Sequence, residues 1–118
     1  MSYSVILFRR EVKDQNKGFD FLEEGASIPD FTTEQFEKLK ARLLKYGYQI
    51  ESENNTAIEF NFKGGLFGIR AALYKNQLTF RAGTNEHGVF EVSQFASEST
   101  NTGEFAKLDM QEGKWEEN

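Results

Sequence analysis

Hydrophobic and polar residues alternate along much of the chain, which is the pattern of β-strands with one buried face. In the clearest example, Ile58, Phe60 and Phe62 alternate with Glu59 and Asn61. The same period continues in four further hydrophobic sets: Tyr48 and Ile50; Phe67, Ile69, Ala71 and Leu73; Leu78, Phe80 and Ala82; and Phe90 and Val92. These sets predict an antiparallel β-meander.

The stretch from Thr33 to Tyr46 has the period of an amphipathic α-helix instead. Its hydrophobic face consists of Phe36, Leu39, Leu43 and Leu44. Thr32 and Gln35 have the spacing of a capping box, and Gly47 can adopt the left-handed conformation that ends a helix. We expect this helix to pack on the hydrophobic face of the meander.

The two ends of the chain follow neither pattern. Residues 3–8 are hydrophobic on both sides, which favours a strand that is covered on both faces. Residues 11–30 show no regular period and are predicted to form a long loop, and residues 97–103 are polar and turn-like. Residues 105–108 and 114–116 are candidates for a last hairpin.

Together these elements predict a single α+β domain that spans residues 1–118. It would have an N-terminal strand and one amphipathic helix packed on an antiparallel β-meander of four to six strands. A chain of 118 residues has the usual length of one domain.

Short connections would set the strand registers, with two-residue turns at 64–65 and 76–77 and longer loops at 53–55 and 84–88. Each choice keeps hydrophobic residues together on one face. The expected pairs are Ile50 with Ile58, Tyr48 with Phe60, Phe60 with Ile69, Ile58 with Ala71, Leu73 with Phe80, Ala71 with Ala82, Ala82 with Phe90, and Phe80 with Val92.

The same registers gather charged side chains on the opposite face of the sheet. Glu59 would lie opposite Arg70, and Arg81 would lie between Ala72 and Glu91. With two polar neighbours, this row is our candidate binding site, which consists of Glu59, Arg70, Arg81, Glu91, Tyr74 and Asn61.

This row has two interpretations. The simpler one is a solvated sheet face, on which opposite charges on neighbouring strands form weak exposed ion pairs. The other is a binding face, on which Arg70 and Arg81 contact a partner or hold an anionic group bidentately. The small residues Ala57, Gly68 and Ala72 would leave shallow space for a ligand or for the N-terminal strand.

Composition narrows the class of partner. The formal net charge of −5 argues against nucleic acid and against an anionic membrane surface, because both attract basic proteins. The chain has no cysteine, which excludes disulfides and thiolate metal sites. No targeting segment or apolar membrane span is recognisable. We expect a cytoplasmic protein without a cofactor, whose partner is another protein, and a homo-oligomer is possible.

Candidate catalytic chemistry centres on the single histidine, His87. It could act as a general base with Glu86 or Glu91, and Ser93 or Ser97 could supply a nucleophile. No nucleophile-elbow motif surrounds either serine, and a single histidine in a loop is more often an ordinary surface residue. One histidine without cysteine also leaves too few ligands for zinc.

The sequence therefore favours a small non-enzymatic protein-interaction domain, such as an inhibitor, an immunity-type protein or an adaptor. The first alternative is a small-molecule-binding domain with an apolar pocket between helix and sheet. The second is a hydrolase-like enzyme that uses His87.

Overall fold

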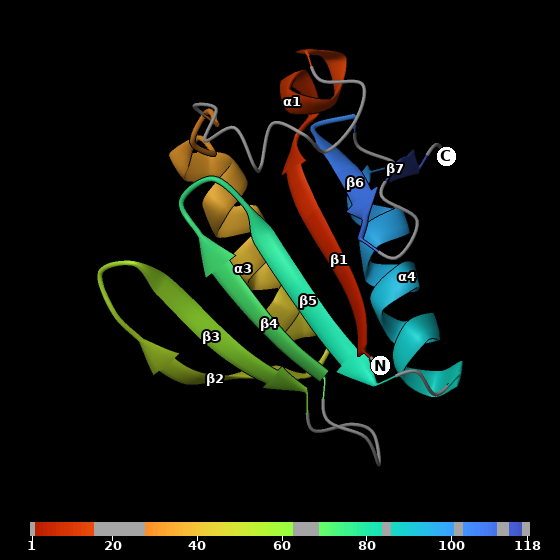
Figure 1. The fold of residues 1–118 in the computed structure, drawn as a ribbon. Helices are drawn as coiled ribbons and strands as arrows, with labels where there is room; N and C mark the ends of the chain where they lie inside the picture. The colour runs from red at the N-terminus through yellow and green to blue at the C-terminus, as the bar shows by residue number, and fades with distance from the viewer. Residues whose placement is uncertain are drawn as a thin grey trace.

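The computed structural model describes residues 2–15, 28–62, 69–83, 86–100, 103–110 and 114–116 (Figure 1). The helices are α1 (Arg10–Gln15), α3 (Thr33–Lys45) and α4 (Glu86–Thr100). The strands are β1 (Ser2–Arg9), β2 (Tyr48–Glu53), β3 (Ala57–Phe62), β4 (Ile69–Tyr74), β5 (Leu78–Gly83), β6 (Phe105–Asp109) and β7 (Lys114–Glu116). The α+β fold class is confirmed, as is the last hairpin, which is formed by β6 and β7.

All neighbouring strands of the sheet are antiparallel, and their order is β2-β3-β4-β5-β1-β6-β7. Six strands make up the body of this sheet, and the three-residue β7 pairs with β6 at one edge. The N-terminal strand is internal, since β1 pairs with β5 on one side and with β6 on the other. The chain is therefore a meander from β2 to β5 that β1 joins to a second, smaller unit.

Both long helices cover the same face of the sheet (Figure 1). The core between the helices and the sheet contains side chains from both helices and from six strands, among them Leu39, Leu43, Phe60, Phe80 and Phe95, each at most 1% exposed. Large aromatic and aliphatic side chains of this kind supply most of the hydrophobic stabilisation of a small domain. The prediction that the helix lies on the hydrophobic face of the meander is confirmed.

One face of the strand β1 is fully buried, and the other is buried at Phe8 and partly buried at Ile6, so the predicted covering of both faces is confirmed in part. Val5 and Leu7 belong to the core beneath the helices. Phe8 points to the other face, into a second cluster that includes Val12 of α1 and Trp115 of β7. The rings of Phe8 and Trp115 meet edge to face with their centroids 5.8 Å apart.

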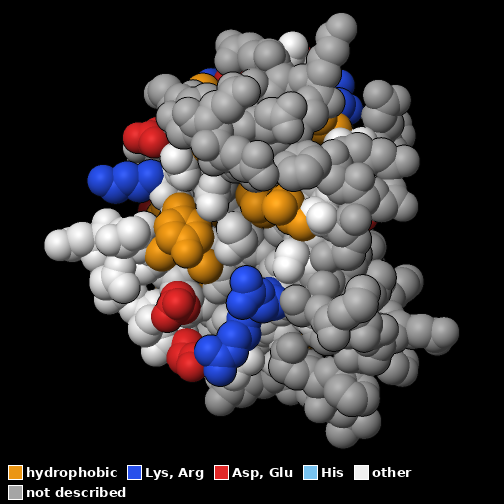
Figure 2. Space-filling model, viewed as in Figure 1, with side chains coloured by type: hydrophobic (Ala, Val, Ile, Leu, Met, Phe, Trp, Pro, Cys, Tyr) orange, Lys and Arg blue, Asp and Glu red, His pale blue; other side chains and the backbone are white. Residues whose placement is uncertain are grey.

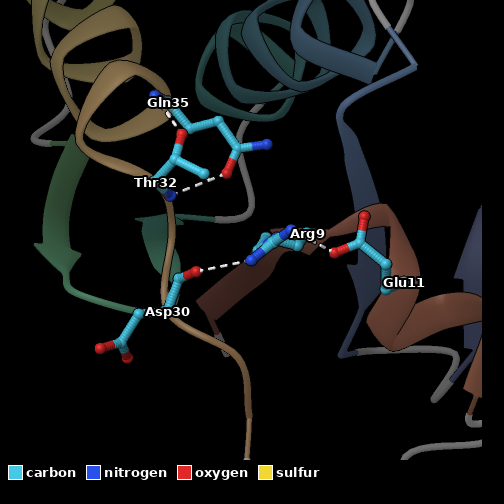
Figure 3. A network of polar contacts seen from close by, with 5 residues as sticks. All are labelled: Arg9, Glu11, Asp30, Thr32 and Gln35. Carbon is cyan, nitrogen blue, oxygen red and sulfur yellow. Dashed lines mark hydrogen bonds and ion pairs between the residues drawn. The ribbon is translucent and has the colours of Figure 1, made fainter.

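The helix α3 has the ends that its sequence predicts, and its capping box is drawn in Figure 3. The backbone N–H of Gln35 donates to Oγ1 of Thr32 at 3.1 Å, and the backbone N–H of Thr32 donates to Oε1 of Gln35 at 2.9 Å. At the other end Gly47 has a φ of 98°, the left-handed conformation that L side chains avoid.

Residues 11–30 are not simply a loop, because the short helix α1 begins at Arg10. Arg9 links both ends of this region to the sheet (Figure 3). Its Nη2 lies 2.7 Å from Oε2 of Glu11, and its Nη1 donates to the backbone carbonyl of Asp30 at 3.0 Å. The prediction of a loop over residues 16–27 lies outside the described residues.

The prediction that Phe90 to Val92 form a strand is wrong, as is the predicted turn over residues 97–100, because residues 86–100 form α4. The positions of α4 that face the core are spaced at i, i+3, i+4 and i+7, namely Val92, Phe95, Ala96 and Ser99, and all four are fully buried. Only the short Phe90–Val92 segment has an alternating pattern, so the helical period over the longer stretch is the better guide.

The predicted registers of β2 with β3, β3 with β4 and β4 with β5 are each displaced by two residues, and the predicted pairs of Ala82 with Phe90 and of Phe80 with Val92 are wrong because β5 pairs with β1 instead. Phe60 pairs with Ala71 and not with Ile69, and Ala71 pairs with Phe80 and not with Ala82. Ile50 pairs with Phe60, and a bulge follows it in β2. Alternation cannot detect such an error, since a shift of two residues leaves every side chain on the same face.

Two connections explain the displacement. The β4–β5 turn consists of Lys75 and Asn76, because the backbone N–H of Tyr74 donates to the carbonyl of Gln77 at 2.8 Å. The Asn76-Gln77 turn is therefore wrong. Residues 63–68 connect β3 to β4, and the predicted turn at 64–65 lies outside the described residues.

Replacement of Phe95 tests the assignment of α4 and the packing of the core. Its ring contacts Phe80, Tyr46 and Tyr48, with centroids 5.1, 5.2 and 6.2 Å away. We expect Phe95→Ala to lower the free energy of unfolding in urea by about 3–5 kcal/mol, because it removes a fully buried ring. Its exposed neighbour in α4 provides the control, Gln94→Ala, which should change stability by less than about 0.5 kcal/mol. Equal effects of the two substitutions would contradict the packing of α4 on the sheet.

Candidate functional site

The face of the sheet opposite the two long helices carries a groove of about 560 Å³ (Figure 2). Its lining side chains come from β1, β2, β3, β4 and β5, with Met110 after β6 at one end. In the view of Figure 2, basic and acidic side chains lie next to each other on this face, and hydrophobic side chains lie beside them. The groove coincides with the surface that the sequence marks as the candidate site.

The strand pairings define a polar row that crosses this face. Arg70 of β4 is paired directly with Arg81 of β5. On the outer side of Arg70 lies Asn61 of β3, and on the outer side of Arg81 lies Ser4 of β1. We call these four residues the arginine row. Directly opposed residues of antiparallel strands have Cβ atoms about 5 Å apart, so the two arginines are immediate neighbours.

The arginine row differs from the predicted one at both ends, where the expected carboxylates are absent. Glu59 is paired with Ala72 and not with Arg70, and it accepts a hydrogen bond from Oγ of Ser52 at 2.8 Å. Glu91 lies in α4, on the other side of the sheet. Its expected place beside Arg81 is taken by Ser4, because the neighbour of β5 is β1.

Within the described part of the chain, the two arginines are therefore poorly neutralised. Nη1 of Arg70 lies 3.9 Å from Oε1 of Glu51, and these side chains are 72% and 46% exposed, so their ion pair is long and largely solvated. The side chain of Arg81 is exposed and makes no hydrogen bond or ion pair with any residue that the structure describes. Like charges directly opposed on neighbouring strands destabilise a sheet. The predicted ion pairs of Arg70 with Glu59 and of Arg81 with Glu91 are therefore not formed.

The residues around the row give the groove its shape and polarity. Ala72 and Thr79, a directly opposed pair, lie next to the arginines and leave room because they are small. Ile6 and Met110 form one wall, and both also pack against the second hydrophobic cluster. Tyr74 lines the groove at the end of β4, so it belongs to the same surface as the arginines.

The candidate catalytic residues are not part of this groove. His87, Glu86, Glu91 and Ser93 belong to α4, which packs on the opposite face of the sheet, and their side chains lie outside the described residues. The hypothesis of a hydrolase that uses His87 therefore stays a prediction. Across the described ranges, no group of three or more His, Cys, Asp or Glu side chains is placed to hold a metal ion.

Sequence reasoning identified five members of this surface, Glu59, Asn61, Arg70, Tyr74 and Arg81, and missed Ser4, Ile6 and Met110. The last three come from β1 and from the end of β6, which pair with the meander only through long-range contacts. A usable signal is the hydrophobicity of residues 3–8 on both faces, since it is typical of an internal strand.

Comparison of the chain with protein-family models, with curated proteins and with solved structures finds no match. No described helix is both long enough and apolar enough to cross a membrane. The function of the protein is therefore inferred from the geometry of the groove.

The repulsion between Arg70 and Arg81 can be measured through stability. We expect Arg81→Glu to raise the free energy of unfolding by roughly 0.5–1 kcal/mol at low salt, because an attractive cross-strand pair replaces a repulsive one. Arg81→Gln should give a smaller gain, and high salt should reduce both by screening. Lys75→Glu, in the β4–β5 turn, makes the same change in net charge and should give no gain. If Arg81→Glu were less stable than the original chain at low salt, the proposed repulsion would be wrong.

Proposed function

We propose that this protein is a non-enzymatic protein-interaction domain, which binds a partner protein through the groove on the open face of its sheet. The observation that carries the proposal is the directly opposed, poorly neutralised pair of Arg70 and Arg81 within that groove. A pair that weakens the isolated sheet is understandable where a ligand supplies the missing negative charge.

The composition of the groove supports a macromolecular partner. Arginine and tyrosine are enriched at protein–protein interfaces and account for much of their binding energy. Here Arg70, Arg81 and Tyr74 line the same groove as the hydrophobic residues Ile6 and Met110. A groove that runs over an open sheet face suits a protein surface better than a small molecule, which is usually enclosed on most sides.

The outer edge of the sheet is a less suitable interface. Among the strands that the structure describes, β2 pairs only with β3, so its other edge is available for a further strand. However, β2 carries Glu51 and Glu53, and its register is interrupted by a bulge between Ile50 and Ser52. Charged side chains and bulges are the features with which proteins prevent edge-to-edge pairing. We therefore place the partner on the open face.

The alternative of a small molecule between helix and sheet gains no support from the described residues. Phe60, Phe80 and Phe95 occupy the middle of that layer and are at most 1% exposed. The ring centroids of Phe80 and Phe95 lie 5.1 Å apart, the spacing of a direct aromatic contact. Large buried side chains thus fill the space that such a ligand would need.

Site-specific photo-crosslinking tests the proposed interface. A photoreactive phenylalanine analogue would replace Tyr74 in one sample and Leu44 in another. Leu44 is 47% exposed and belongs to α3, the helix that covers the opposite face of the sheet. After irradiation in a lysate of the source cells, we expect a discrete adduct from position 74 only. The captured protein would then be purified, and its affinity measured by calorimetry.

With the purified partner, Tyr74→Ala should weaken binding at least about tenfold, as expected for an aromatic residue within an interface. Leu44→Ala should leave the affinity within about twofold. The proposal would be wrong if position 74 gave no adduct or if both positions gave the same one. It would also be wrong if Tyr74→Ala left the affinity unchanged.

A further inference from the structure

We propose that Arg70 and Arg81 together bind one carboxylate, the side chain of an Asp or Glu in the partner protein. This inference rests on the proposed function, because it names the chemical group that the partner inserts into the groove. The proposed ligand is thus an acidic residue within a peptide segment, and not a nucleic acid or a free phosphate.

The geometry of the arginine row suits a planar anion. Two guanidinium groups on directly opposed residues can approach the same point above the sheet, and each presents parallel N–H donors that match the two oxygens of a carboxylate. The side-chain amide of Asn61 and the hydroxyl of Ser4 lie next in the row and are further hydrogen-bond donors. The two arginines are therefore flanked by a hydrogen-bond donor on each side.

The charges around the row select a monoanion. Glu51 and Glu59 both line the groove, and Glu51 is already 3.9 Å from Arg70. A phosphate group carries up to two negative charges, and a nucleic acid carries many, so these carboxylates would repel either of them more strongly than they repel one carboxylate. The net charge of −5 acts in the same direction.

The hydrophobic wall indicates what lies beside the acidic residue. Ile6 and Met110 are partly buried and line the same groove as Arg81. Ser4, the direct partner of Arg81, lies two residues before Ile6 in β1, and its carbonyl accepts a hydrogen bond from the backbone N–H of Met110 at 3.2 Å. A segment that places its acid on the arginines therefore brings a neighbouring side chain to this wall. We expect that neighbour to be hydrophobic, because it displaces water from apolar surface.

A peptide selection tests the inference even while the partner protein is unidentified. The complete protein would be used to select binders from a displayed library of random linear peptides. Binding sites would be mapped by NMR from the amide signals of Ile6, Arg70 and Thr79. We expect peptides that bind this face to share one Asp or Glu beside a hydrophobic residue. Replacement of that acid by Asn or Gln should weaken binding at least about tenfold.

Three protein variants complete the design. Arg70→Gln and Arg81→Gln should each weaken the acidic peptide about tenfold or more, but should change the affinity of the Asn or Gln peptide by less than about threefold. Lys45→Gln removes an exposed cation from α3, on the other side of the sheet, and should leave both affinities unchanged. Thermal unfolding would verify that each variant is folded before its affinity is measured.

The outcomes separate this inference from the proposed function. Peptides that bind the face with no requirement for an acid, or with no loss in the arginine variants, would overturn the carboxylate site and leave the interface in place. If none of the selected peptides were acidic and millimolar inorganic phosphate displaced them from this face, the inference would be overturned in favour of a phosphate ligand. Absence of any peptide on this face also overturns it. The proposed function has its own test, in the crosslink from position 74 and in the effect of Tyr74→Ala on the affinity for the purified partner.

Discussion

The pairing of β1 with β5 on one side and with β6 on the other joins the two parts of the sheet. Without it, the meander from β2 to β5 and the hairpin of β6 and β7 would share no backbone hydrogen bonds. The same strand contributes to both hydrophobic clusters, through Val5 and Leu7 on one face and Phe8 on the other. It also brings Ser4 and Ile6 to the groove, so the fold and the candidate site depend on one set of backbone contacts.

The accuracy of the sequence-based predictions followed the range of the interactions involved. The helix α3 was predicted correctly, because its capping box and hydrophobic stripe are local signals. The helix α4 was missed, because Ser99 interrupts an otherwise hydrophobic stripe and the short Phe90–Val92 alternation resembles a strand. Strand positions were largely right, but registers were displaced by two residues, since hydrophobic alternation distinguishes only odd shifts from even ones.

The candidate site shows the same division. Alternation alone predicts that Arg70 and Arg81 lie on the face of the sheet opposite the helices, and the structure has both residues on that face. Their neighbours were wrong, because the neighbour of a strand residue depends on register and strand order, which are long-range properties. The difference changes the chemistry of the surface. In the predicted row each arginine had a carboxylate beside it, whereas the observed row has Asn61 and Ser4 in those places.

The internal position of β1 also has a consequence for how the protein folds. This strand emerges from the ribosome before its partners β5 and β6, which are synthesised much later, so its two edges stay unpaired during most of translation. Pairings between residues so far apart in sequence form slowly, because a long stretch of chain must be ordered to close them. During that interval the apolar β1 segment would be open to aggregation or to capture by chaperones. The groove would acquire its Ser4 and Ile6 side only at the end of folding, so an incompletely folded chain would not yet present the finished binding surface.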